Sequence, residues 1–585
     1  MESATPGLDR NLVTIGGAPE GFDARLILKE IKLRKVPVLH VARDDKRLAI
    51  MRASLRFFAP EMPVLSFPGW DCLPYDRVSP NADISAARMA TLAGLTHFMP
   101  SQFVLLTTLN AAMQRVPARR LLSGAAFTAE VGKRIDEVEL KEFLVRMGFT
   151  QAPNVMEPGD YAVRGGIIDV YPPGKAGPVR LDLFGDVLDG ARRFDPTTQR
   201  TTEKLLSVEF APVSEVILDP AAITRFRQNY RIAFGSVGGD DPLYEAVTAG
   251  RKYQGIEHWI GLFHEQLETL FDYLPSAAIT LDEQIKPAQI ARWETVQDQY
   301  ETRRAALAQK SRIDTVYKPA PPELLYLDEA AWQAATHNRR VMQFHSLAQA
   351  SGPGATDAGG RIGRNFAPER QQENIGLFSA VVAHVKSRLQ HGSVVIASYS
   401  EGSLARLTGL IADEGLAGAV VISNGARLED RGLYLAVWPL EHGFETSDLT
   451  VISEQDVLGD RMIRPAKKRR KVENFLTETQ ALTRDDLVVH VNHGIGRFHG
   501  LEVITAAGAA HECLLLEYAD NARLYLPVEN IELLSKYGHD EGPLDRLGGV
   551  AWQVKKARLK QRIRDMADRL IQVAAERALR RAPVL

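Results

Sequence analysis

The sequence predicts a multidomain α/β protein that ends in a small antiparallel β-barrel and a long helix. Three observations support this fold class. The first hundred residues alternate strand-like apolar runs with helix-like segments. Residues 487–537 contain short apolar runs separated by Gly, Asn or Asp, which is typical of antiparallel strands joined by tight turns. The 585 residues are also enough for three to five domains.

The composition indicates an ordinary soluble protein with a large core, because 45% of the residues are hydrophobic and 25% are charged. Cys72 and Cys513 are the only cysteines, which excludes a disulfide framework or a cysteine-rich zinc site and favours a reducing compartment. No run of eighteen apolar residues and no signal-like N-terminus occurs, so we expect a cytoplasmic protein. The net charge of −2 conceals local asymmetry, so a nucleic-acid surface must be sought in single segments.

Residues 1–118 form the first predicted domain, a doubly wound α/β lobe. VPVLHVA (36–42) is a near-continuous apolar run suited to a strand buried on both faces, and residues 44–58 follow with helical spacing. The strand signal returns at 64–67 and 103–108.

The first βα turn of this lobe, Thr14–Ala24, is rich in glycine but does not match a nucleotide-binding loop. Such a loop needs a Lys for the terminal phosphates, followed by a Ser or Thr for magnesium, and both are missing. Glu20 and Asp23 would repel phosphate oxygens. The sequence therefore predicts no ATP site in this turn.

Residues 67–92, FPGWDCLPYDRVSPNADISAARMATL, predict a loop packed by its own aromatic side chains, followed by a helix that Asn81 or Asp83 caps. The segment resembles the corresponding parts of UvrB, the damage-verifying repair helicase, and of the bacterial transcription-repair coupling factors. In the coupling factors the first lobe keeps a RecA-like helicase fold without the nucleotide loop. The resemblance implies a degenerate lobe that residues 213–340 complete.

Residues 119–212 predict an inserted α+β domain, in which a helical signal gives way to strands with Gly, Pro and Asp turns. RGGIIDVYPPG and RLDLFGD resemble the UvrA-binding domain shared by UvrB and the coupling factors. From composition alone, Arg164, Arg180 and Phe184 are a solvated face and a core aromatic. The resemblance implies instead that these three residues engage UvrA, with arginine forks and an aromatic anchor.

Residues 341–455 predict a second small α/β domain, whose words LEHGFE and ISEQDVLGDR resemble the third domain of the coupling factors. Glu441 and His442 are most simply a strand-end turn, because no partner completes an acid/base site. Residues 456–484 predict a basic linker, since RMIRPAKKRRK carries seven basic residues and no acid. Direct contact of this run with DNA is the alternative.

Residues 485–548 form the predicted barrel, in which VHVNHGIGRFHGL, YADNARLYLPVENI and LDRLGG resemble the RNA polymerase interaction domain of the coupling factors, a relative of CarD. The resemblance implies an SH3- or Tudor-like fold. It also implies that an edge strand pairs with the β subunit of RNA polymerase through Leu501, Glu502, Val503 and Ile504. Four histidines and Cys513 show no metal-site spacing, so we expect no metal. These histidines are His490, His493, His499 and His511.

Residues 549–585 predict one basic helix with a single apolar stripe. The stripe comprises Leu559, Ile563, Met566, Leu570 and Val573. This helix resembles the relay helix that leads into the ATP-driven translocase lobes of the coupling factors.

The resemblance covers nearly the whole chain and corresponds to the N-terminal half of that family. It implies a role in transcription-coupled nucleotide-excision repair, with RNA polymerase, UvrA and double-stranded DNA as partners. Whether the chain is an enzyme stays open, because the family's helicase-like ATP hydrolase lobes, which use ATP and Mg²⁺, are absent from this sequence. We expect no catalytic residue and no cofactor in this chain. A motor-less adaptor and a UvrB-type damage-binding subunit are the alternatives.

Overall fold

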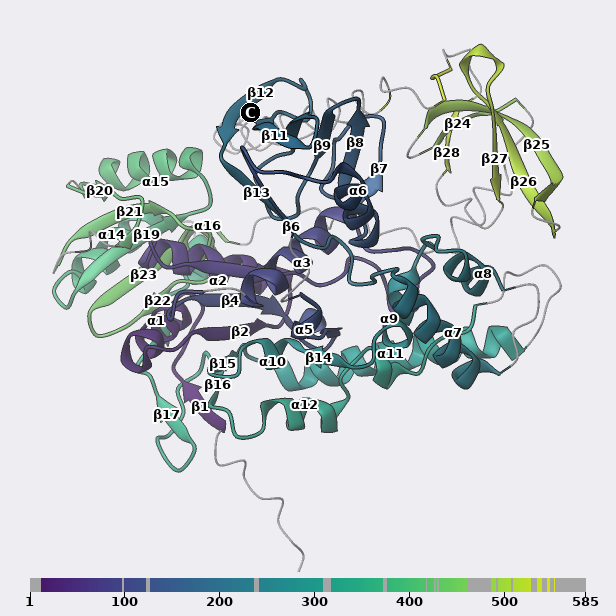
Figure 1. Cartoon of the computed structure of the whole chain (residues 1–585). Coiled ribbons are helices and arrows are strands. Elements are labelled where there is room, and N and C mark those ends of the chain that lie inside the picture. The colour runs from purple at the N-terminus through teal and green to yellow at the C-terminus, as the bar shows by residue number, and fades with distance from the viewer. Residues whose placement is uncertain are drawn as a thin grey trace, which may run out of the picture. The chain divides into compact units, whose positions relative to one another are not determined.

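The computed structural model in Figure 1 describes most of the chain between residues 12 and 552. The described ranges are 12–96, 99–122, 127–235, 241–308, 317–371, 376–416, 418–425, 428, 431–459, 485–490, 493–506, 509–527, 534–538, 544–547 and 552. The chain divides into two compact units. The first contains 1–128, 142–149 and 209–461, and the second contains 129–141, 150–208 and 462–585.

The first unit is built on a seven-stranded parallel sheet with the order β17-β1-β16-β15-β2-β4-β3. Its strands are β1 (Leu12–Gly16), β2 (Val38–Ala42), β3 (Val64–Phe67), β4 (Val104–Thr108), β15 (Ala278–Leu281), β16 (Val341–Phe344) and β17 (Ala355–Asp357). Alternate residues of β2 enter two different cores: Leu39 and Val41 enter one, and Val38 enters the other. Helices therefore cover both faces of the sheet, as the apolar runs predict.

Helices α1 (Phe22–Arg34) and α2 (Asp45–Phe58) cover one face. The other face is covered mainly by α3 (Ala82–Thr96), α4 (Leu109–Ala112), α10 (Leu270–Tyr273) and α12 (Glu329–Thr336). The remaining elements of this part are β5 (Arg115–Pro117), α5 (Arg119–Leu122), α7 (Pro220–Phe234), α8 (Pro242–Thr248), η1 (Ile256–Trp259), α9 (Ile260–Phe263), β14 (Leu267–Thr269), α11 (Ile285–Ala308) and η2 (Pro322–Leu324). Among the described helices, none is long and apolar enough to cross a membrane.

The first unit also contains a six-stranded mixed sheet with the order β18-β22-β23-β19-β21-β20. Its strands are β18 (Arg361–Ile362), β19 (Ser393–Ser398), β20 (Val420–Val421), β21 (Leu433–Val437), β22 (Phe444–Glu445) and β23 (Leu449–Ser453). Its helices are α13 (Ala367–Gln371), α14 (Leu377–Arg388), α15 (Glu401–Asp413) and α16 (Glu454–Leu458). Trp438 joins this domain to α2: its ring stacks on Phe57 at 4.2 Å between centroids, and its Nε1 donates to Ser54 Oγ at 3.1 Å.

The second unit contains a six-stranded sheet with the order β12-β11-β10-β9-β8-β7. Its strands are β7 (Thr150–Gln151), β8 (Asp160–Arg164), β9 (Ile167–Val170), β10 (Val179–Phe184), β11 (Val187–Phe194) and β12 (Thr201–Leu205). The short β6 (Phe127–Glu130), α6 (Glu137–Arg146) and β13 (Ser207–Phe210) flank them in sequence. β8 to β12 pair antiparallel, which agrees with the predicted mixture of strands and tight turns.

A five-stranded antiparallel sheet with the order β27-β26-β25-β24-β28 forms the C-terminal part of the described chain. Its elements are β24 (Leu487–His490), β25 (Gly494–Ala506), β26 (Ala509–Glu517), η4 (Ala519–Asn521), β27 (Arg523–Pro527) and β28 (Leu534–Gly538). The antiparallel strands that the turn pattern predicts are thus present. Residues 460–484 of the predicted linker and, apart from Trp552, the predicted helix 549–585 lie outside the described residues.

Candidate functional sites

In the turn between β1 and α1, the carboxylate of Asp23 lies where a nucleotide-binding loop would hold a phosphate. Asp23 Oδ1 accepts hydrogen bonds from the Gly21 amide at 3.0 Å and the Ala24 amide at 2.8 Å. Amides at a helix N-terminus are the groups that bind phosphate in nucleotide-binding folds. Here the carboxylate of Asp23 already occupies these amide donors.

Arg47 of α2 holds this turn through three carboxylates. Its guanidinium lies 3.0 Å from Glu20, 2.6 Å from Asp23 and 2.9 Å from Asp282, and its side chain is 13% exposed. Burial, together with the negative charges of Asp282 and Glu20, raises the pKa of Asp23 to about 6 against the pull of Arg47. Burial also lowers the pKa of the neighbouring His40 to about 4. The cluster therefore sets three carboxyl groups against a single guanidinium.

The second α/β domain covers the same turn. Glu20 Oε1 accepts from the Glu441 amide at 2.7 Å. Gly21 has φ 86°, and a Cβ there would lie 3.0 Å from the Phe444 ring, so only glycine fits this approach. Glu441 and His442 lie in the turn between β21 and β22, as predicted. His442 Nδ1 lies 3.1 Å from the buried Asp456 Oδ1, and this hydrogen bond raises the pKa of His442.

Two of the three predicted UvrA-contact residues lie at neighbouring hairpin ends of the second unit's sheet. Arg164 pairs with Ile167 across the Gly165-Gly166 turn, and Ile167 pairs in turn with Asp182 of β10. Phe184 ends β10 and is 84% exposed, so the interpretation of this residue as a core aromatic is wrong. Arg164 is also exposed, and its guanidinium donates to the Pro153 carbonyl at 2.5 Å.

Arg180 lies further along β10 and has a structural partner. It pairs in register with Asp169 of β9. Its Nε and Nη2 lie 2.7 and 2.8 Å from the two oxygens of this nearly buried carboxylate. The guanidinium also lies 4.9 Å from the Phe194 ring centroid. Arg180 therefore has a buried charged partner, whereas the exposed Arg164 donates to the neutral groups of Pro153 and Asn154.

The four predicted polymerase-contact residues lie in the part of β25 that extends past β24. β24 pairs with Gly494–Arg497 only, whereas Gly500–Ala506 pair with β26 on the other side. Within the described chain, the outer edge of 501–504 therefore has no strand beside it. Leu501 is 55% exposed and Glu502 is exposed, while Ile504 is partly buried.

The histidines of this sheet have individual partners. His499 contacts Glu517 through Nε2 and lies 3.6 Å from Asp485 through Nδ1. The ring of His490 lies 4.6 Å from that of His493, and burial and this neighbour lower the pKa of His490 to about 4. His511 pairs in register with Ile504, and Cys513 is buried. No group of three metal-ligating side chains gathers within the described ranges.

Two family models match the chain where these surfaces lie. The UvrB interaction domain matches residues 127–215, and the CarD-like/TRCF RID domain matches residues 482–538. The chain is 31% identical over 549 residues to the transcription-repair-coupling factor of Rickettsia bellii and 30% identical over 574 residues to that of Escherichia coli. These alignments cover 93% and 96% of this chain.

This chain is a homologue of the transcription-repair-coupling factors. It spans about half the length of the curated relatives it matches, 47% of the Rickettsia protein and 48% of the Escherichia coli protein. In this homologue, sequence reasoning missed Asp169 and Ile167. The two-residue Gly165-Gly166 turn signals the pairing of β8 with β9, which places Ile167 opposite Arg164. The pairing of Asp169 with Arg180 depends instead on the longer connection 171–178 between β9 and β10, which gives no comparable signal.

Proposed function

We propose that this chain acts in transcription-coupled nucleotide-excision DNA repair, where it binds RNA polymerase stalled at a lesion and recruits UvrA. The observation that carries the proposal is that one chain contains both a UvrB interaction domain and a CarD-like/TRCF RID domain. Each matched region also carries an exposed surface suited to a protein partner. The ATP-driven translocation of the family belongs, in this proposal, to motor lobes outside this sequence.

The polymerase surface is the outer edge of β25 at residues 501–504. A strand of the polymerase β subunit that pairs there would use the backbone groups that face away from β26. The exposed Leu501 and the partly buried Ile504 would supply side-chain contacts on opposite faces of the added strand. The same match supports an SH3- or Tudor-like barrel for this sheet.

Ile504→Arg tests this surface. We expect it to weaken binding to RNA polymerase by about 2 kcal/mol or more, roughly thirtyfold in Kd, as truncation of an interface anchor does. Val421→Arg places the same charge on β20, an exposed edge strand of another sheet, and should leave binding unchanged. The measurement is biolayer interferometry with immobilised polymerase. Equal affinity of the wild type and Ile504→Arg would reject the assignment.

The UvrA surface comprises the two hairpin ends that carry Arg164 and Phe184. A phenyl ring that is 84% exposed is costly in water, and its burial against a partner would supply a central apolar contact. Arg164 supplies a charged donor on the neighbouring hairpin. Arg180 lies further along the same strand and keeps its predicted place in the contact, with a side chain that is 20% exposed beside Asp169.

Phe184→Ala tests this surface without disturbing the core. Co-elution with UvrA in gel filtration should be lost or strongly reduced. Leu206→Ala is the matched control, because Leu206 is 87% exposed in the same unit and lies outside the two hairpins. Loss of UvrA binding in both variants, or in neither, would show that the surface is misplaced.

We further propose that the seven-stranded lobe is a RecA-like fold that has lost its nucleotide site. The parallel sheet with helices on both faces supports the fold. The occupied amides of Gly21 and Ala24, with the carboxylates around Arg47, support the loss of nucleotide binding.

A further inference from the structure

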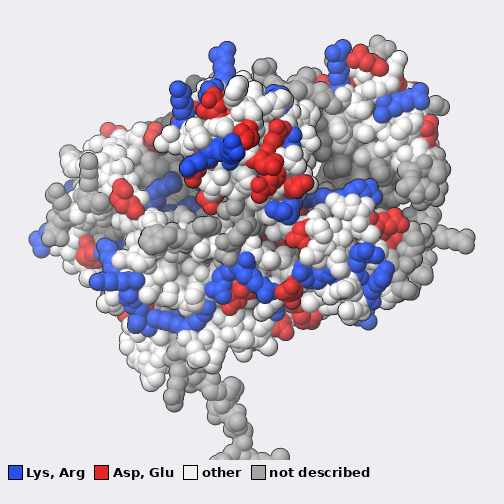
Figure 2. Space-filling view, in the orientation of Figure 1, with Lys and Arg blue, Asp and Glu red and all other residues white. Residues whose placement is uncertain are grey.

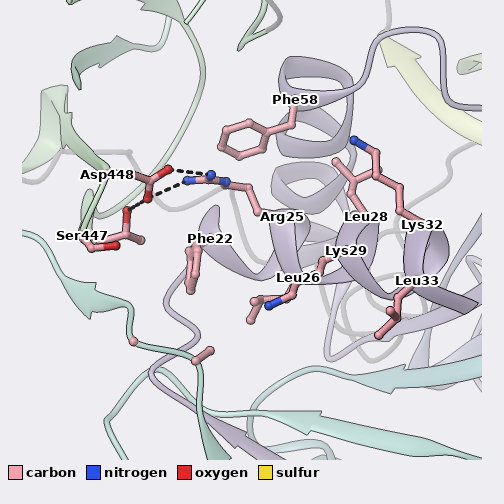
Figure 3. Close-up of a pocket in the computed structure, with 13 residues that line it drawn as sticks. Phe22, Arg25, Leu26, Leu28, Lys29, Lys32, Leu33, Phe58, Ser447 and Asp448 are labelled. Carbon is pink, nitrogen blue, oxygen red and sulfur yellow. Dashed lines mark hydrogen bonds and ion pairs between the residues drawn. The ribbon is translucent and has the colours of Figure 1, made fainter. Parts of the chain in front are cut away.

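A cluster of basic side chains covers the C-terminal half of α1 and the turn before β16. We name it the α1 basic patch, and its members are Lys29, Lys32, Arg34, Lys35, Arg339 and Arg340. Figure 2 shows Lys and Arg gathered over the region where α1 lies in Figure 1. Figure 3 shows Lys29, Lys32 and the exposed Leu33 along α1.

The charge of the α1 basic patch is largely uncompensated. Arg34 and Arg340 share a single carboxylate oxygen of Glu30, at 2.7 and 2.6 Å. Among the described residues, no carboxylate lies within ion-pair distance of Lys29, Lys32 or Lys35; these three lysines are exposed. Glu30 thus forms the ion pairs of the patch, while Asp272 lies close enough to act on the charge of Arg339 and Asp448 lines the same pocket as Lys29 and Lys32.

Helix capping explains only part of this cluster. Cations in the last turn of a helix are favoured by its dipole, which accounts for one or two charges. Lys29 lies before the last turn, and Arg339 and Arg340 belong to another segment. Lys35 occupies the C-cap position with φ 57°, a left-handed conformation that glycine or asparagine adopts at less cost. A lysine at this position adds positive charge where backbone geometry favours a neutral residue.

The patch adjoins a cavity of about 560 Å³ at the amino-terminal edge of the parallel sheet. Arg34, Arg339 and Arg340 line it together with the neutral polar Ser276 and Asn338. The Arg339 guanidinium donates to the Leu274 and Phe271 carbonyls at 2.8 and 2.7 Å. Its main contribution to the cavity is therefore its positive charge, because these carbonyls already take two of its N–H donors. The cavity therefore presents positive charge and polar groups without an unpaired acid in its lining.

These features fit the phosphate backbone of a duplex. Lys29 and Lys32 lie three residues apart in α1, about 4.5 Å of helix rise, and Lys35 follows at the C-cap just beyond the helix, so the three lysines follow one another toward the end of α1. A duplex carries one charge per about 1.7 Å of its axis, which allows each lysine to reach a phosphate. None of the six members is aromatic, so the patch offers no stacking platform for single-strand bases.

We propose that the α1 basic patch binds the phosphate backbone of double-stranded DNA without regard to sequence. The residues of this patch belong to the first unit, whereas those of the UvrA and polymerase surfaces belong to the second. The proposal does not depend on either of them, because it rests on the first unit alone.

The test compares the whole 585-residue chain with Lys29→Ala/Lys32→Ala/Lys35→Ala. Fluorescence anisotropy with two 25-base-pair duplexes of unrelated sequence gives Kd between 50 and 200 mM salt. Each lost phosphate contact reduces the slope of log K against log salt by about 0.9, so three contacts reduce it by about 2.7. Across this salt range the wild type should therefore lose about fortyfold more affinity than the triple variant.

The control variant is Lys133→Ala/Lys175→Ala/Lys204→Ala, which removes three exposed lysines of the second unit. It should keep the wild-type slope, and far-ultraviolet circular dichroism should show that both variants are folded. Equal slopes for the wild type and the Lys29/Lys32/Lys35 variant would overturn the proposal. Unchanged duplex binding with loss of binding to a polyglutamate peptide would also overturn it and assign the patch to an acidic protein.

Discussion

Replacing Asp23 by Asn tests whether a buried charge really occupies the turn after β1. Asn keeps an oxygen that can accept from the Gly21 and Ala24 amides. It removes the negative charge that lies 2.6 Å from Arg47. The variant therefore separates the shape of the turn from its charge.

The pH dependence follows from the raised pKa of Asp23. Burial is the main cause of the increase from 3.8 to about 6, Arg47 opposes it, and Asp282 and Glu20 reinforce it. A carboxyl group with a raised pKa binds its proton more tightly in the folded state than in the unfolded state. Its contribution to stability is thus fully present below about pH 4 and is lost as the pH rises through about 6. Linkage with these two pKa values gives a loss on the order of 1 kcal/mol between pH 5 and pH 8.

The assay is urea unfolding of both proteins at pH 5, 6, 7 and 8, followed by tryptophan fluorescence. Relative to Asp23→Asn, the wild type should become less stable by an amount on the order of 1 kcal/mol from pH 5 to pH 8. Ala24→Gly disturbs the same helix start without a titratable group, so its difference from the wild type should not change with pH. A wild-type minus Asp23→Asn difference that is flat, or that grows with pH, would refute the buried-charge account.

Three further predictions concern the loop and two internal ion pairs. Calorimetry should detect no ATP binding at the Gly16–Ala24 turn, because the Asp23 carboxylate already accepts from the turn's amides and the negative charge of the turn repels phosphate. ATP binding that is abolished by substitutions in this turn would contradict the prediction. Arg180→Ala should lower the stability of its domain in urea by about 3 kcal/mol, since it leaves a nearly buried carboxylate unpaired, whereas Phe184→Ala should change it by under about 0.5 kcal/mol. Arg88→Met should lower the free energy of unfolding by about 3 to 5 kcal/mol, because it leaves the carboxylate of Glu215 buried without its partner; the two side chains are 0% and 2% exposed and 2.5 Å apart. The double variant Arg88→Met/Glu215→Met should recover most of that stability, and full stability of the single variant would argue against the pair.

The local elements of the first lobe were predictable, but their arrangement was not. Continuous apolar runs predicted β2, β3 and β4 within two residues of their observed limits, because strands buried on both faces need apolar residues throughout. The sheet order depends on β15 and β16, which enter between β1 and β2 from about 240 and 300 residues further along the chain. Their four-residue runs are too short to distinguish from helix segments by periodicity.

The candidate surfaces were predictable as positions but not as environments. Arg164 and Arg180 have the same chemistry and similar neighbours in sequence. Only the register of β9 with β10 places a carboxylate against one of them, and a slip of one residue would move that carboxylate to the other face. Phe184 is the last residue of β10, where it pairs with Val187 across the hairpin end, and its ring is 84% exposed there. These facts depend on pairing between strands, which composition does not encode.

Helix α1 runs from the carboxyl ends of the parallel strands to their amino ends, here called the carboxyl edge and the amino edge of the sheet. Negative charge lies at its beginning and positive charge at its end. Its N-terminus follows β1, where Asp23 satisfies the free amides, and its C-terminus precedes β2, where the exposed lysines lie. Both placements are favourable to the helix dipole, although the left-handed backbone of Lys35 has a conformational cost of its own. A phosphate-bearing ligand is repelled at the carboxyl edge, where nucleotides bind in related α/β folds, and is attracted at the amino edge. The acids of the β1–α1 turn therefore leave the amino edge as the more favourable side of this helix for a polyanion.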